Sequence, residues 1–144
     1  MSLLRRFGPG LVALALGACA GHPAAEPPLS VARQDYYLHC LGCHGEDGAG
    51  LAGQVPDLRT DLARLASAPG GRAYVLRVPG VIQSNLAPDR VAEVLNYTGR
   101  EFGGAEVARR IAPFTAAEVA EARAAPLLEI TTTRARVIAG SDAR

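Results

Sequence analysis

Two thiols and an imidazole lie within five consecutive residues of this chain, in the stretch CLGCH. Cys40 and Cys43 are separated by two residues, and His44 directly follows the second cysteine. Side chains at this spacing can form a disulfide or a redox pair, bind a metal, or hold a prosthetic group covalently. The only other cysteine among the 144 residues is Cys19, so a second pair of thiols does not exist.

Four interpretations of this stretch compete, and three of them leave part of it unexplained. A disulfide between Cys40 and Cys43 gives His44 no role, and a thioredoxin-like pair requires a helix where the chain is instead rich in glycine. A structural zinc site needs four ligands, usually in two pairs. The fourth interpretation is covalent haem attachment, whose signature is C-x-x-C-H, because one helical turn presents both thiols to the porphyrin and the imidazole to the iron. We therefore predict one haem c, bound by Cys40 and Cys43 with His44 as an axial iron ligand, and keep a bare disulfide as the alternative.

Beyond these five residues, the segment from about Ser30 to Tyr97 resembles the small monohaem c-type cytochromes. Ser30 can cap a first helix that leads into the cysteines, and a glycine-rich loop follows His44. Pro56 lies twelve residues after His44. The resemblance implies that the Pro56 carbonyl accepts a hydrogen bond from the second imidazole nitrogen and belongs to the haem-binding residues. An ordinary turn proline is the alternative.

The resemblance also implies an all-α fold, with a small helical domain around the covalent haem over residues 31–98. Apolar residues at helical spacing predict two short helices, 60–67 and 72–78, separated by the sequence APGG. Pro88 suits the first turn of a later helix, which matches the C-terminal helix of the family.

The usual sixth iron ligand of the family, a methionine in a Met-Pro pair, is missing. By its distance from the later helix, that pair falls on Val78 and Pro79, and the only methionine of the chain is Met1. Gln83 and Asn85 lie in the same predicted loop and are weak candidate ligands, although turn and capping roles explain them more simply. We expect an open or weakly ligated iron, with a lower reduction potential than a methionine ligand would give.

The first residues have the order of parts that an export signal requires: two arginines, a short apolar run and small residues. We predict a signal peptide over residues 1–19 of the lipoprotein type, with a lipid attached to Cys19. An ordinary signal cleaved after residue 20 is the alternative. Residues 20–30 are rich in proline and alanine and would form a tether between the lipid and the domain.

A C-terminal extension follows the expected haem domain over residues 99–144. Thr115 and Glu118 can form a capping box, which predicts an extra helix over residues 115–125 that ends before a proline. The rest of the extension has strand propensity but no visible partner strand, so we expect a mobile or loosely docked tail.

Together these features predict an exported protein of the bacterial periplasm that carries single electrons, and we expect a carrier more than an enzyme. Two alternatives stay open: a haem protein that binds or reduces peroxide, NO or CO at an open iron, and a haem subunit that docks on a larger periplasmic dehydrogenase. The net charge of +1 and the lack of a basic stripe give no support to nucleic-acid binding. The expected partners are redox proteins as electron donor and acceptor, and the membrane through a lipid anchor.

Overall fold

The structure is a computed structural model that describes residues 29–143, except for the side chain of residue 106. The expected signal peptide (1–19), Cys19 and most of the tether (20–30) lie outside the described residues. Within the described range the regular elements are helices, with one isolated bridge between Leu51 and Val55, and the all-α prediction is confirmed. The helices are α1 (Val31–His39), α2 (Leu41–His44), α3 (Asp61–Ser67), α4 (Gly71–Arg77), α5 (Pro79–Ile82), α6 (Pro88–Glu101), α7 (Gly104–Arg110), α8 (Ala116–Ala124) and α9 (Ile130–Asp142).

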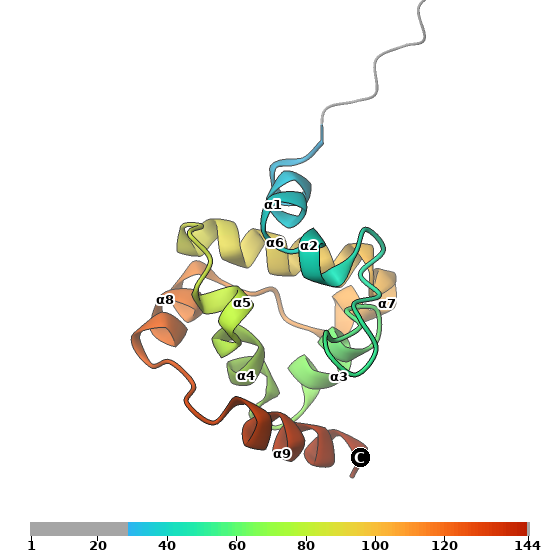
Figure 1. Cartoon of the computed structure of the whole chain (residues 1–144), viewed down its shortest axis with the longest axis vertical. Coiled ribbons are helices and arrows are strands. Elements are labelled where there is room, and N and C mark those ends of the chain that lie inside the picture. Colours follow the sequence, from blue (N-terminus) through green and yellow to red (C-terminus); the bar gives the residue numbers. More distant parts are fainter. Residues whose placement is uncertain (1–28, 144) are drawn as a thin grey trace, which may run out of the picture.

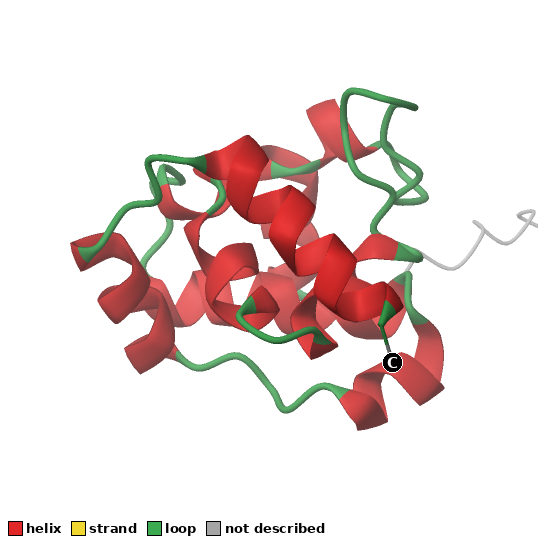
Figure 2. Ribbon diagram, turned by 90° about the horizontal axis from the view of Figure 1, so that it is seen from below, coloured by secondary structure: helices red, strands yellow, loops and turns green. Residues whose placement is uncertain are grey.

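The helices are arranged around the middle of the molecule, with α1 and α9 at opposite ends (Figure 1). α1 packs on α6, and α6 also carries α7 and α8. α3 and α4 pack against each other, and α8 contacts α4 as well as α6. Seen from below, the helix that ends at the C-terminus crosses in front of the others (Figure 2), where it contacts α3 and α4. The C-terminal extension therefore packs along two sides of the preceding helices.

Buried polar and aromatic groups fix α1 to α6. Asp35 is only 2 % exposed and accepts two hydrogen bonds from the Arg90 guanidinium, at 2.6 and 2.7 Å. Tyr36 is completely buried, and its ring centroid lies 5.0 Å from that of Phe102 and 6.1 Å from that of Tyr97. Cys40 directly follows α1, so the contacts that fix α1 to α6 also fix the position of the turn that contains the two cysteines.

Several predicted helix starts are confirmed. The side chain of Ser30 accepts a hydrogen bond from the backbone N–H of Arg33 and caps α1, and Pro88 occupies the first turn of α6. Thr115 and Glu118 form the predicted capping box of α8. The short helices α5 and α7 were not predicted, because α5 has only four residues and α7 lies in a polar, glycine-containing stretch without a clear apolar pattern.

The tail expected to be mobile and strand-prone is instead the helix α9. Val137 on this helix is buried, and Arg134 pairs with Asp61 of α3 at 2.8 Å. Asp142 at its end pairs with Arg64 at 2.6 Å. Threonine and isoleucine favour strands only where a sheet can receive them. Here burial on α3 and α4 and the two ion pairs stabilise a helix, which local propensity could not reveal.

Candidate haem site

The two cysteines and the histidine lie on a single short turn of helix. Cys40 ends α1 and begins α2, and its carbonyl accepts hydrogen bonds from the backbone N–H groups of Cys43 and His44, at 3.2 and 3.0 Å. Both thiols are free; Cys43 is exposed and Cys40 is half-buried. Burial, the carboxylate of Asp35 and the neighbouring Cys43 raise the pKa of Cys40 to about 11, so this thiol is protonated at neutral pH.

The imidazole of His44 has a fixed tautomer. Its Nδ1 lies 3.1 Å from the carbonyl oxygen of Pro56, and a carbonyl oxygen can only accept, so Nδ1 carries the hydrogen. Burial lowers the pKa of His44, and the hydrogen bond to Pro56 only partly offsets this effect. The ring is therefore neutral near pH 7, and its Nε2 lone pair is available to a metal.

The loop after α2 holds the Pro56 oxygen in place. The N–H of Gly50 donates to the His44 carbonyl at 2.8 Å, and Leu51 and Val55 exchange two backbone hydrogen bonds. Gly50 has a φ of +66°, and a Cβ at this position would lie only 2.4 Å from the Pro56 oxygen. The backbone of Gly50 thus approaches Pro56 more closely than any other residue type allows.

Aromatic side chains support the site from the side of α6. The hydroxyl of Tyr36 donates to the carbonyl of Gly45, directly after His44, at 2.6 Å. Burial raises the pKa of Tyr36 to about 12, so this donor keeps its proton at any physiological pH. Gly48 lies against the ring of Phe102, where a Cβ would come within 2.8 Å of the ring. The start of the loop is therefore attached to the same aromatic cluster that joins α1 to α6.

The structure brings the predicted proximal residues together, while the candidate distal residues belong to α5 and the connection that follows it. Val78 is half-buried at the start of α5, where it packs against the hydrophobic core. Gln83 and Asn85 follow α5, and both side chains are exposed. In the part of the chain that the structure describes, no hydrogen bond joins either residue to His44.

The donor set fits a covalently bound haem. Two free thiols and an unpaired imidazole nitrogen share one helical turn, and among the described helices α2 packs closely only against α1. A disulfide is not formed between Cys40 and Cys43, and His44 takes part in a hydrogen bond that orients it as a ligand.

No family model matches the chain, but similar proteins are known. Cytochrome c-552 of Thermus thermophilus is 32 % identical over 109 residues, an alignment that covers 63 % of this chain and 83 % of that protein. A second cytochrome c-552 of Thermus thermophilus, from strain ATCC 27634, is also 32 % identical over 109 residues, covering 63 % of this chain and 74 % of that protein. The chain belongs to the c-type cytochromes.

As a c-type cytochrome, the protein has covalently bound haem c as its cofactor, and it transfers electrons to and from redox partners. The predictions of family, fold class and cofactor are thereby confirmed. The haem iron supplies the one-electron couple, while the chain supplies attachment, orientation and access to partners.

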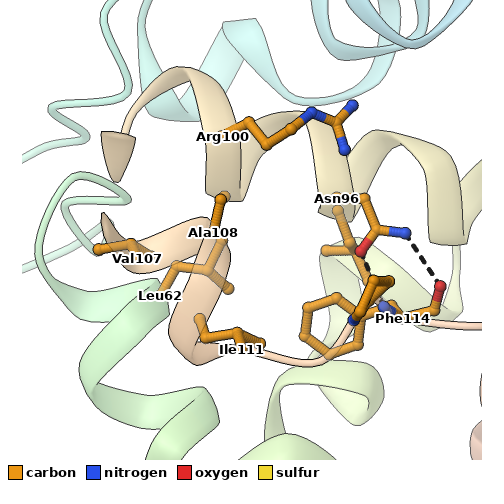
Figure 3. A pocket seen from close by; sticks show the side chains of 10 residues that line it. Leu62, Asn96, Arg100, Val107, Ala108, Ile111 and Phe114 are labelled. Atoms are coloured by element: carbon orange, nitrogen blue, oxygen red, sulfur yellow. Dashed lines mark hydrogen bonds between the residues drawn. The ribbon is translucent and has the colours of Figure 1, made fainter. Parts of the chain in front are cut away.

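A cavity of about 160 Å³ lies elsewhere in the cytochrome, where the extension closes over α6 (Figure 3). Leu62, Leu95 and Phe114 line it, and Asn96 both donates to and accepts from the backbone of Phe114, at 2.9 and 2.7 Å. Neither the cysteines nor His44 line this cavity. It marks the junction between haem domain and extension and is separate from the thiols and the imidazole.

Sequence reasoning missed the groups that hold the loop in place. The glycine-rich composition after His44 was visible, but composition did not reveal that Gly50 is the glycine in contact with Pro56. The role of Tyr36 was also missed, although an aromatic residue one turn before Cys40 is a detectable signal in hindsight.

We expect Gly50→Ala to destabilise the haem-loaded cytochrome by about 1–3 kcal/mol more than Gly53→Ala, because the new methyl group would overlap the Pro56 carbonyl. Gly53 is a matched control: its φ is +74°, so it carries similar backbone strain, but a Cβ there meets nothing within 4 Å. Urea unfolding measures both variants. Equal losses in the two variants would contradict the assigned contact.

Proposed function

We propose that this cytochrome carries single electrons between redox proteins of the bacterial periplasm, through one haem c held by Cys40, Cys43 and His44. The observation that supports this most is the 3.1 Å contact between His44 Nδ1 and the Pro56 oxygen. It leaves Nε2 free for iron on the same helical turn as two free thiols.

In this proposal each residue of the set has one task. The sulfurs of Cys40 and Cys43 hold the porphyrin by thioether bonds, and Nε2 of His44 binds the iron. The Pro56 carbonyl fixes the ring plane and increases the electron donation of the imidazole, which stabilises the oxidised iron. The hydroxyl of the buried Tyr36 holds the end of α2 to α1, and the ion pair between Asp35 and Arg90 holds α1 to α6.

We propose that the cytochrome is exported and anchored by a lipid on Cys19, with residues 20–30 as the tether. The order of charge, apolar run and small residues supports export, and the sequence LGAC supports lipidation. Among the helices of residues 29–143, none is both long and apolar enough to cross a bilayer. Its partners would be periplasmic electron donors and acceptors near the membrane surface.

On the side of the haem opposite His44, we propose an iron with an open or weakly held sixth position. Val78 has no donor atom where the family has methionine, and Met1 belongs to the proposed signal. Gln83 and Asn85 are the nearest weak candidates by sequence, and both are exposed. These observations support a second candidate function, the binding or reduction of a small molecule such as peroxide, NO or CO.

Replacing both cysteines by serine tests the attachment. Cys40→Ser with Cys43→Ser should give a chain without covalent haem, because serine does not add to the porphyrin as a thiol does. Haem staining after denaturing electrophoresis, with intact mass, measures this in cells able to mature c-type cytochromes. Gly42→Ala serves as a control on the same turn, since a Cβ there meets nothing within 4 Å. Haem that stays with the double variant through denaturation would rule out these two attachment points.

Carbon monoxide tests the sixth position. The reduced cytochrome should bind CO and change its absorption spectrum, because no strong ligand competes for the iron. Val78→Met restores a thioether at the position of the family's ligand and should raise the reduction potential and weaken CO binding. A native spectrum that is indifferent to CO would show a strong sixth ligand and remove the second candidate function.

Cys19→Ser tests the anchor. We expect the native cytochrome to sediment with membranes and the variant to be released, because a covalent diacylglyceryl group contributes most of the membrane affinity. Ala24→Ser in the tether is the control and should stay with the membrane. Native protein found in the soluble periplasmic fraction would argue for the ordinary signal instead.

A further inference from the structure

Arg123 of α8 reaches back from the extension to the connection between α5 and α6. Its Nη2 lies 2.9 Å from the carbonyl oxygen of Ser84 and 2.8 Å from that of Leu86. The hydroxyl oxygen of Ser84 lies 3.3 Å from the same nitrogen. Since Nη2 has two hydrogens, both are used by the two carbonyl groups. One guanidinium thus joins two points of the connection that follows Val78.

The helix that carries Arg123 is itself firmly docked. Val119 on α8 is completely buried, and Glu118 accepts two hydrogen bonds from Arg72 of α4, at 2.6 and 2.9 Å. Arg72 also donates to the carbonyls of Ala112 and Pro113, directly before α8. The position of the Arg123 backbone is therefore set largely by the packing of α8 on α4 and α6.

The connection itself has little else to hold it. The side chains of Gln83, Asn85 and Ala87 are exposed, and only Leu86 among its apolar side chains packs on the core. Its other hydrogen bonds in the described chain are local, such as that from the Ser84 hydroxyl to the Val81 carbonyl at 2.9 Å. Few buried contacts leave such a segment free to shift unless an external group fixes it.

Burying the Arg123 guanidinium in this place has a cost. Its Nε is buried and has no hydrogen-bond partner among the described residues. A buried donor without an acceptor opposes folding, so the contacts of Nη2 must compensate for it. An apolar side chain in place of Arg123 would cover α5 and α6 without leaving a buried donor unpaired.

We propose that Arg123 is a positioning residue for the distal side of the haem. By holding the carbonyls of Ser84 and Leu86, it fixes the connection that follows Val78 and α5, and would thereby limit the access of external ligands to the iron. The C-terminal extension is then part of the haem environment and not only a cover for α3 and α4. This inference rests on the proposed function, because it takes the side of Val78 as the distal side.

A CO titration of the reduced, haem-loaded full-length protein tests the proposal. Arg123→Ala should increase the affinity for CO by at least about fivefold, the size of a modest coupling between two sites. Arg136→Ala is the matched control, because Arg136 is an exposed arginine of α9 in the same extension, and it should leave the affinity unchanged.

Arg123→Lys provides a second test that does not depend on the alanine variant folding. Lysine keeps the charge but lacks the planar group that spans two carbonyls, so a smaller increase in the same direction is expected. Equal CO affinities of the Arg123 and Arg136 variants, with haem attached in both, would overturn the role of Arg123 alone. Loss of covalent haem from the native protein would instead contradict the proposed function.

Discussion

The hydrogen bond between His44 and the carbonyl of Pro56 is the constraint on which the rest of the site depends. It sets the tautomer, because only Nδ1 can donate to that oxygen, and it thereby directs the lone pair of Nε2. To hold the oxygen there, the loop needs the close approach of Gly50, and it needs Gly48 against Phe102. The orientation of one ring thus requires contacts from α1, from the loop and from the end of α6.

Two arginines join the extension to the helices before it, one from each part of the chain. Arg72 of α4 binds the start of the extension, and Arg123 of the extension binds the connection before α6. Arg72 also holds the pKa of Glu118 at about 2, with a smaller contribution from Thr115. The carboxylate stays ionised above that pH, so its contribution to stability is lost only as the pH falls below the usual range of a glutamate toward 2. Because Arg72 also lies over the ring of Phe114, charge and apolar burial act at the same contact.

Whether a feature could be predicted from the sequence depends on how far apart in the chain the interacting residues lie. The cap at Ser30 and the capping box at Thr115 act within a few residues, so local sequence patterns predicted them. The pairing of His44 with Pro56 closes a single loop, and the resemblance to the family implied it. The helix α9 was missed because its stability comes from burial against α3 and α4, with ion pairs to Asp61 and Arg64, all far away in the chain. The contact of Arg123 with Leu86 joins residues 37 positions apart, and no local pattern points to it.

The two sides of the proposed haem site differ in the same way, in the sequence separation of the residues that form them. On the proximal side the thiols and the imidazole lie within residues 40–44, and the Pro56 carbonyl follows twelve residues after His44, although Tyr36 and Phe102 also hold this segment in place. In our proposal the distal side has Val78 in place of a methionine, and it depends on the connection that Arg123 of the remote helix α8 holds. On this proposal, substitutions at Arg123 would alter the access of ligands to the iron without releasing the haem, because Cys40 and Cys43 lie in a different part of the chain.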